Sequence, residues 1–430
     1  MKRGPVLSSA LLVVAVTLAS CDVSGSVEVT TSQATASPAG NTTATSGATV
    51  PGTSAVPPAD LIVWTDDLHA IALDSIVPAF EQESGVNVIV ELVDFAATRD
   101  QVRVAGLAGE GPDIFIGSSD WVGDLAGQGL LEPLDLGERT QEFTRSSTSA
   151  LTYNGTLYGL PYAAEAVAMY FNTDLAPEAP ITMDDAAAAC ATMRNITNCI
   201  GLPGGDLGTV AYHQYPFLTA AGGYIFGVTD EGYDVTDVGL DSAGSIAGAQ
   251  ALEALITGGA IGSTSYDSAK SQFLNGTEPF WITGPWELGS VTNQDTVNWS
   301  VAKLPRIAGG TPRPFVGVQA FFLTSFSENK LVAQAFLLNV VATEQGMTAL
   351  YAVDGRPPVH KAIISAVADD PVMSAFTSSA TDGVPIPNIP AMSSVWAPLG
   401  SNLLLLGDGG IDGETAMINT ARTVREVVDQ

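Results

Sequence analysis

The residues best suited to chemistry are carboxylates that follow short apolar runs. Asp66 and Asp67 come after the run that ends at Trp64, and Asp120 comes after another such run. Glu165 is a lone acid among small apolar residues, where an unpaired buried carboxylate would be costly. We therefore expect Glu165 to face a cleft and to pair with a ligand hydroxyl rather than with a structural cation.

The other residue types limit what these acids can do. Three histidines and three cysteines are too few and too scattered for a zinc or redox site, so we expect no metal and no cofactor. No G-x-G-x-x-G or phosphate-loop signature is present, so a nucleotide is not indicated. The carboxylates can then accept hydrogen bonds from a ligand or act as general acid and base.

Alternating strands and helices must position these acids. The pattern predicts, in order, strand 61–64, helix 70–83, strand 86–92, helix 99–108, strand 113–116 and a helix start at 118–120. Strand, helix and strand in about thirty residues are typical of a right-handed parallel crossover, which predicts an α/β fold. Ligands of such sheets bind beyond the carboxyl ends of the strands, where Asp66, Asp67 and Asp120 would lie.

Composition narrows the class of ligand. The chain has 430 residues, with 16 Lys plus Arg against 46 Asp plus Glu, a formal charge of −30. With so little basic surface, nucleic acid is excluded as a partner and anionic ligands are disfavoured. The chain is 46% hydrophobic but has no apolar run long enough to cross a bilayer, so it is not a polytopic membrane protein. A neutral or cationic ligand is favoured, and the length allows two or three domains.

The N-terminus has the features of a secretory signal. Met1-Lys2-Arg3 is basic, residues 7–18 are mostly apolar, and Leu18-Ala19-Ser20-Cys21 resembles the bacterial lipobox. We expect a lipoprotein signal peptide at 1–20 and acylation of Cys21, which would hold the protein on the outer face of the cell membrane or on its periplasmic side. The alternative is an ordinary signal peptide with an incidental cysteine.

The segment after this signal differs in composition from the rest. Residues 21–58 are rich in Ser, Thr and Ala and lack large apolar residues, so we expect a disordered tether, with the globular part starting near Ala59. Once Cys21 is acylated, Cys190 and Cys199 form an even pair outside the cytoplasm, where a disulfide is favoured over two buried thiols. The bond would pin the end of an Ala-rich helix predicted at 183–193.

Ordered sequence blocks along the whole globular region resemble a known family. They include Gly109-Glu-Gly-Pro-Asp-Ile-Phe115, Leu160-Pro-Tyr-Ala-Ala-Glu-Ala166, Ala221-Gly-Gly-Tyr224, Thr283-Gly-Pro-Trp286 and Pro387-Asn-Ile-Pro-Ala-Met-Ser393. The chain resembles the extracellular solute-binding proteins of ABC sugar importers, specifically the maltose/maltodextrin-binding type.

The resemblance implies a two-lobed periplasmic-binding-protein fold with a ligand cleft between the lobes, closing by hinge bending. The N-terminal lobe would comprise 59–163 and 321–369, and the C-terminal lobe 169–315 and 372–430. The three hinge crossings would fall at 164–168, 316–320 and 370–371.

The resemblance also assigns aromatic roles. A sugar presents C–H patches on its faces and hydroxyls around its rim, so it needs flat rings together with acceptors. Trp286 and Trp396 stand where the family stacks sugar rings, against the alternative that they are core residues. Tyr212 and Tyr266 match family ligand tyrosines.

Among the acids, Asp120 matches a hydroxyl acceptor of the family, with helix capping as its alternative. Asp67 is preferred over Asp66, although the loop is one residue shorter than in the family pattern. Trp121 replaces an arginine of the enteric members, and Gly117 replaces a tryptophan. We interpret the two changes together as moving one aromatic ring that stacks on sugar from position 117 to position 121. Leu68 stands where those members have a lysine, so the resemblance does not fix which sugar chain length or glycosidic linkage is preferred.

The function implied is that of a monomeric substrate-binding subunit, anchored by its lipid, that captures maltose or maltodextrin and delivers it to the permease subunits of an ABC transporter. Another neutral sugar, such as trehalose or a cyclodextrin, is the main alternative. A secreted glycosidase with Asp120 as acid and Glu165 as nucleophile is less favoured, since the family uses these acids only as acceptors, so no enzyme activity is expected.

Overall fold

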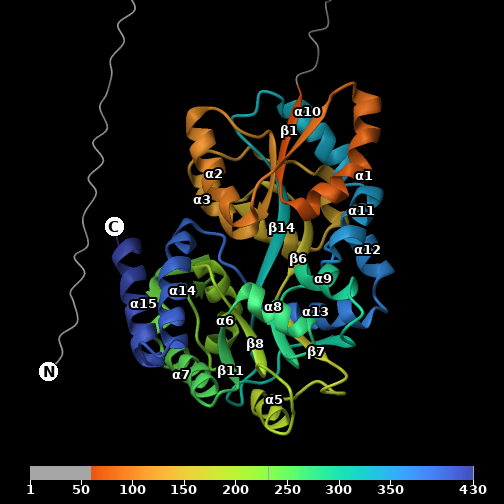
Figure 1. The fold of residues 1–430 in the computed structure, drawn as a ribbon. Helices are drawn as coiled ribbons and strands as arrows, with labels where there is room; N and C mark the ends of the chain where they lie inside the picture. The colour runs from red at the N-terminus through yellow and green to blue at the C-terminus, as the bar shows by residue number, and fades with distance from the viewer. Residues whose placement is uncertain (1–59, 231, 430) are drawn as a thin grey trace, which may run out of the picture. The chain divides into compact units, whose positions relative to one another are not determined.

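Two β-sheets organise the chain, and the computed structural model describes residues 60–230 and 232–429 of it (Figure 1). The strands of the two sheets are β1 (Leu61–Thr65), β2 (Val88–Leu92), β3 (Ile114–Ser118), β6 (Gly159–Glu165), β7 (Ala168–Asn172), β8 (Ile200–Gly204), β11 (Ile261–Ser265), β12 (Phe280–Thr283), β13 (Trp299–Ala302), β14 (Phe315–Leu323) and β15 (Val384–Pro385). The first sheet has the order β15-β14-β3-β1-β2, with β6 also paired to β14, and the second has the order β11-β8-β12-β7-β13.

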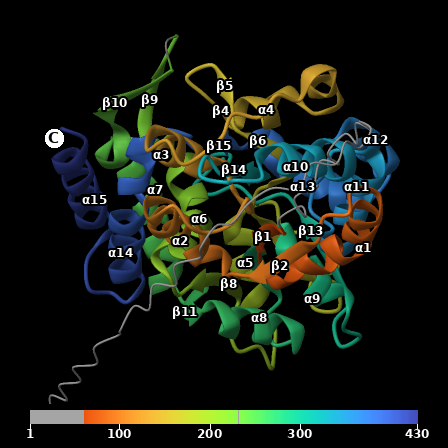
Figure 2. The same ribbon diagram turned by 90° about the horizontal axis from the view of Figure 1, so that it is seen from above.

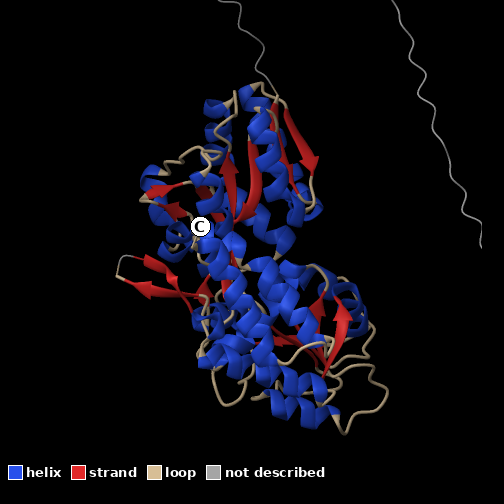
Figure 3. Ribbon diagram, turned by 90° about the vertical axis from the view of Figure 1, so that its left-hand side faces the viewer, coloured by secondary structure: helices blue, strands red, loops and turns tan. Residues whose placement is uncertain are grey.

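Helices cover the strands of both sheets (Figure 3). They are α1 (Asp67–Ser84), α2 (Phe95–Ala108), α3 (Val122–Gly127), α4 (Arg145–Ala150), α5 (Met183–Cys190), α6 (Leu207–Ala220), α7 (Ala243–Thr257), α8 (Tyr266–Leu274), α9 (Leu288–Thr292), α10 (Lys330–Phe336), α11 (Glu344–Asp354), α12 (Lys361–Ala366), α13 (Pro371–Asp382), α14 (Trp396–Gly407) and α15 (Gly413–Val428), with short 3₁₀ turns at η1 (Ser119–Trp121) and η4 (Pro285–Glu287). None of the helices in the described ranges has both the length and the apolarity that crossing a bilayer requires.

Two small hairpins lie outside these sheets and at the margin of the view from above (Figure 2). Their strands are β4 (Thr152–Tyr153) with β5 (Thr156–Leu157), and β9 (Phe226–Thr229) with β10 (Gly232–Val238). Asn154 and Gly155 form the first turn, both with positive φ, which suits these residue types.

The predicted alternation of strands and helices at the start of the described chain is confirmed. β1 pairs in parallel with β2 and with β3. Alternate side chains of β1 are fully buried, as expected for a strand in contact with a core. α1 begins after its cap Asp66 and ends at Gly85 in the left-handed conformation, so it is longer at its start than the predicted 70–83.

Each sheet has its own apolar core. Val63 of β1 and Phe336 of α10 belong to the core beside the first sheet. Phe280 of β12 and Leu399 of α14 belong to the core beside the second. The structure is therefore a mixed α/β fold, as the sequence predicts.

Two strands connect these cores. β6 ends at Glu165 and β7 begins at Ala168, so only two residues separate a strand of the first sheet from one of the second. Along β14, Phe315 lies in the second core and Phe321 in the first. The division into two lobes that move about three hinge crossings stays a prediction.

Cys190 and Cys199 form a disulfide, so the prediction of a bond rather than two buried thiols is confirmed. The Ala-rich helix ends at Cys190 instead of the predicted Met193, because the chain turns there toward Cys199, the residue before β8. The predicted signal peptide 1–20, the lipidation of Cys21 and the predicted tether 21–58 all lie outside the described residues.

Candidate ligand-binding site

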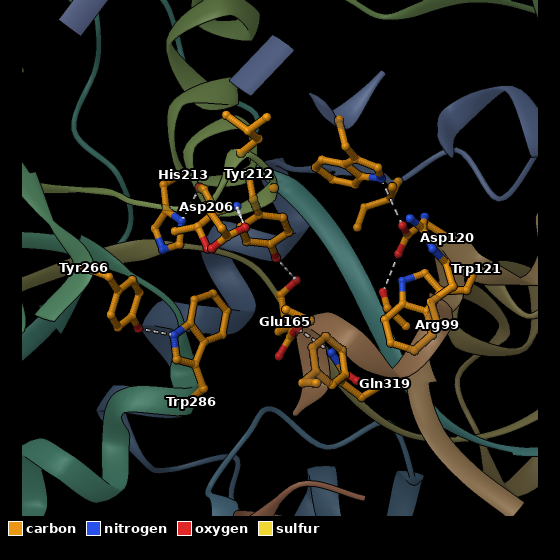
Figure 4. A pocket seen from close by; sticks show the side chains of 18 of the residues that line it. Arg99, Asp120, Trp121, Glu165, Asp206, Tyr212, His213, Tyr266, Trp286 and Gln319 are labelled. Carbon is orange, nitrogen blue, oxygen red and sulfur yellow. Dashed lines mark hydrogen bonds between the residues drawn. The ribbon is translucent and has the colours of Figure 1, made fainter. Parts of the chain in front are cut away.

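A cavity of about 520 Å³ is lined by residues from both sheets and from their helices. Figure 4 shows side chains of β6, β14 and η1 on one side and of α6, α8 and η4 on the other. Eight of the nine predicted ligand residues line it: Asp66, Asp120, Trp121, Glu165, Tyr212, Tyr266, Trp286 and Trp396. The sequence therefore predicts residues that the fold brings together from distant segments.

Asp67 is the predicted ligand residue that does not line the cavity. It is the first residue of α1 and is exposed, whereas Asp66 caps the helix and faces the cavity. Asp66 Oδ1 accepts hydrogen bonds from the backbone N–H of His69 at 2.9 Å and from His69 Nδ1 at 2.7 Å. Burial opposes ionisation, but the bonds and charge of His69 hold the pKa of Asp66 below its usual value.

Glu165 has a structural cation, contrary to the expectation from its sequence neighbours. Arg356 Nε lies 3.2 Å from Glu165 Oε2, and Gln319 Nε2 donates to Glu165 Oε1 at 2.7 Å. Glu165 lines the cavity as expected, and only the expected lack of a structural cation was wrong, because Arg356 and Gln319 lie far along the chain, in the loop after α11 and on β14. Burial raises the pKa of Glu165 even though Arg356 and Gln319 oppose the rise.

Arg356 is a cavity residue that the sequence analysis missed. Its Nη1 lies 2.7 Å from His69 Nε2 and 3.1 Å from Asp354 Oδ2. A continuous path of polar contacts thus runs from Asp66 through His69 and Arg356 to Glu165. Nothing in the local sequence around Arg356 indicates this role, since each partner comes from another element.

Asp120 joins the two sides of the cavity. Its Oδ1 accepts from Ser118 Oγ at 2.6 Å, and its Oδ2 accepts from Trp396 Nε1 at 3.2 Å. It lies inside η1, and no side-chain cap bond is formed there, so the alternative reading as a helix cap does not describe it. Burial raises the pKa of Asp120 despite the bond from Ser118.

Two tryptophans at the cavity rest on glycines. A Cβ built on Gly284 would lie 1.9 Å from Trp286 Cζ3, and one built on Gly117 would lie 2.4 Å from Trp121 Cζ3. Each indole therefore occupies the space that a side chain on its glycine would need. The ring of Trp121 fills the space left open at Gly117, and its use as a stacking surface for sugar stays a prediction.

Aromatic rings gather around Trp286. The ring centroids of Tyr212 and His213 lie 5.9 Å and 5.7 Å from that of Trp286. The Tyr212 hydroxyl donates to the backbone oxygen of Glu165 at 3.2 Å. His213 was not predicted from the sequence; burial lowers its pKa to about 4, so its ring is neutral near pH 7.

The arrangement suits a ligand with many hydroxyl groups and apolar ring faces. Carboxylate oxygens supply acceptors, and indole faces supply flat apolar surface. Within residues 60–230 and 232–429, no three His, Cys, Asp or Glu side chains are grouped so as to hold a metal ion.

The chain is similar in sequence to known proteins. The profile of the family described as bacterial extracellular solute-binding protein matches residues 75–375. The chain is 28% identical over 383 residues to a galactooligosaccharide-binding protein of Bacillus subtilis, covering 85% of this chain and 89% of that protein. It is 28% identical over 388 residues to a maltooligosaccharide ABC transporter solute-binding lipoprotein of Streptococcus pneumoniae, covering 86% and 89%. A maltotriose-binding protein of Pyrococcus abyssi is 31% identical over 307 residues, covering 69% and 65%.

Proposed function

The chain belongs to the family of bacterial extracellular solute-binding proteins, and from this premise we propose that it is the oligosaccharide-binding subunit of an ABC importer. The observation that carries the proposal is the cavity, where carboxylates and indole rings face the same space. Its relatives are named for galactooligosaccharide, maltooligosaccharide and maltotriose binding. A neutral oligosaccharide needs both features, because it presents hydroxyls at its rim and C–H groups on its faces.

The proposed binding mode follows from the contacts at the site. Trp286 and Trp396 stack on sugar rings, while Asp66, Asp120 and Glu165 accept hydrogen bonds from hydroxyls. Burial raises the pKa of Asp120 and Glu165, and hydroxyl donors from the sugar would favour the charged forms again. Binding and ionisation of these acids should therefore support each other.

We propose that two lobes close around the sugar. Their boundaries are those predicted from the sequence, 59–163 with 321–369 and 169–315 with 372–430. Support comes from β6, which leads into β7 after two residues, and from β14, whose ends lie in different cores. The sugar would stabilise the closed state only by its higher affinity for that state.

The place of the protein in the cell is part of the proposal. We propose that Cys21 carries the lipid that holds a monomer at the outer face of the membrane, where the closed form meets the permease subunits. The relative from Streptococcus pneumoniae is named as a lipoprotein of an ABC transporter. The preferred sugar is proposed to be of the maltose or maltodextrin type, with galactooligosaccharides, trehalose and cyclodextrins as competitors.

We also propose that the protein hydrolyses none of its ligands. Asp120 and Glu165 are each held by donors from the protein, namely Ser118 and Trp396 for the first and Gln319 for the second. Such contacts fix the two acids as acceptors, whereas hydrolysis needs one of them to deliver a proton and the other to attack.

Isothermal titration of the chain from Ala59 with maltose, maltotriose, a galactooligosaccharide, trehalose, a cyclodextrin and cellobiose tests the proposal. We expect one of these to bind with a Kd on the order of 1 μM, about −8 kcal/mol. The same samples should contain no released monosaccharide after prolonged incubation. No binding across the panel would overturn the ligand class, and released glucose or galactose would establish a hydrolase.

A further inference from the structure

We propose that Tyr266 is a positioning residue, whose hydroxyl holds the Trp286 indole in place together with Glu287 and Lys270, and does not hydrogen-bond to the sugar. This inference rests on the proposed function, because it specifies how one wall of the sugar site is kept in shape. It assigns roles to Glu287 and Lys270, which do not line the cavity.

The hydrogen bonds of the Tyr266 hydroxyl are all used within the protein. A phenol has one proton to donate and two lone pairs to accept with. Its oxygen lies 2.6 Å from Glu287 Oε1, which can only accept, and 2.5 Å from Trp286 Nε1, which can only donate. Thr283 Oγ1 lies 3.3 Å from the same oxygen and takes the remaining lone pair. The hydroxyl is left with no hydrogen bond for a ligand.

Glu287 is fixed in turn by a cation. Lys270 Nζ lies 2.9 Å from Glu287 Oε2, and the Glu287 side chain is 4% exposed. Tyr266 and Lys270 are four residues apart on α8, so they share one face of the helix, and each contacts a different oxygen of the Glu287 carboxylate. Glu287 follows Trp286 directly in η4, so its position also fixes the backbone that carries the indole.

The consequence for Trp286 is that its ring can interact with a ligand only through a face. Its N–H is occupied by Tyr266, and one side of the ring lies against Gly284. Figure 4 shows Tyr266 beside Trp286, joined through this bond, with His213 and Tyr212 nearby. This end of the cavity should therefore recognise the apolar face of a sugar ring by stacking.

The experiment compares Tyr266→Phe, Glu287→Leu, Glu287→Gln and their combinations in the full mature chain. Maltotriose, or whichever sugar the titration panel identifies, serves as the probe, and affinity and tryptophan emission are both measured. We expect Tyr266→Phe and Glu287→Leu each to weaken binding about tenfold, and the double variant to lose little more, because residues in one network do not act additively. Glu287→Gln should retain more affinity than Glu287→Leu, since its amide oxygen can still accept from the Tyr266 hydroxyl.

Emission distinguishes positioning from direct contact. In the positioning model, Tyr266→Phe shifts the emission of the ligand-free protein, and the shift disappears when Trp286 is replaced by Phe. Asp267→Asn, a change of an exposed acid on the same helix, should alter neither readout. Lys270→Met, at a half-exposed position, removes the cation that fixes Glu287 but leaves the Glu287 side chain unaltered, so it should weaken binding and shift the emission in the same direction as Glu287→Leu.

Two outcomes would overturn the inference. In the first, Tyr266→Phe weakens sugar binding without changing the emission, while Glu287→Leu and Lys270→Met bind the sugar as the unaltered protein does. That result would establish direct contact between Tyr266 and the sugar. The other is emission that is unchanged in every variant. If no sugar of the panel binds, the proposed function fails, but the emission of the ligand-free variants still decides whether Tyr266 holds Trp286.

Discussion

Arg356 Nε lies 3.2 Å from Glu165 Oε2, and both side chains are almost completely buried, 9% and 11% exposed. The pair lies at the wall of the cavity, where β6 and the loop after α11 meet. A buried charge that loses its partner is far more costly than an exposed one, because water cannot replace the lost contact. This pair therefore links the stability of the fold to the shape of the site.

Replacing the cation of this pair should destabilise the protein strongly. We expect Arg356→Met to lower the free energy of unfolding by about 3 to 5 kcal/mol, since it leaves Glu165 and Asp354 without their cation. Arg425→Met is the matched control, because the Arg425–Asp241 pair is 39% and 30% exposed and should contribute about 1 kcal/mol or less. Urea unfolding of both variants measures the difference; equal losses would contradict the prediction.

Removal of either indole that we propose to stack on the sugar should weaken sugar binding. Burying on the order of 100 Å² of ring surface at about 25 cal/mol per Å² corresponds to about 2.5 kcal/mol, or roughly 70-fold in Kd. Trp286→Leu and Trp396→Leu should show losses of this order in a titration with the preferred sugar. Trp299→Leu serves as control, because Trp299 does not line the cavity and should change stability without changing affinity. Unchanged affinity in both site variants would remove the assignment.

Adding one methyl group under an indole should displace that indole. Gly284→Ala places a Cβ 1.9 Å from Trp286 Cζ3, too close for any contact, so the ring must move. We expect a loss of sugar affinity of about tenfold or more, with a shift in tryptophan emission. Gly289→Ala, in α9, meets nothing within 4 Å and should be neutral or slightly stabilising. If Gly284→Ala binds sugar like Gly289→Ala, Trp286 does not stack where we place it.

Glu278 should make the folded protein less stable as the pH rises. It is fully buried, with Asn198 Nδ2 donating to its Oε2 at 2.9 Å, and burial raises its pKa from 4.5 to about 8. The folded state then binds the proton more tightly than the unfolded chain, so the free energy of unfolding falls as pH rises from about 4.5 to about 8.

Glu278→Gln, which stays neutral, should remove this fall of roughly 1.4 kcal/mol per pH unit within that window. The measurement is urea unfolding at half-unit pH steps, compared with Glu83→Gln, whose side chain is exposed. The same slope in Glu278→Gln as in the unaltered protein would show that another group is responsible.

The Cys190–Cys199 disulfide closes a short loop at the end of α5. By the chain-entropy estimate for a loop of about ten residues, it contributes about 2 to 3 kcal/mol. Dithiothreitol should therefore lower the melting temperature of the unaltered protein and leave that of the double variant Cys190→Ala, Cys199→Ala unchanged. A reductant effect of equal size in both proteins would mean that the bond is not its source.

Local signals were sufficient for much of the fold. The apolar run at Leu61 predicts β1, and Gly85 marks the end of α1, because both depend on neighbours in the sequence. The preference for Asp67 over Asp66 was wrong about which side chain lines the cavity, because that depends on where α1 begins. The structure decides it through the bonds of Asp66 to His69, which only the formed helix can make.

The missed parts of the site all depend on contacts between distant segments. In the sequence Glu165 has no charged neighbour, because Arg356 and Gln319 approach it only after β6, β14 and α11 have assembled. The role proposed for Glu287 is hidden in the same way, since its partners come from α8. Residue types and a resemblance can select residues that line the cavity, but not the second set of residues that holds them in place.

The glycines beneath the indoles have a consequence for how such a site changes over generations. Gly284 and Gly117 are invisible to a ligand, yet the volume that each leaves open decides where an aromatic ring can lie. A single codon change at a glycine can therefore reshape a subsite while the tryptophan above it is retained. Divergence in sugar preference among descendants of this protein should accordingly be sought at these small residues as well as at the rings.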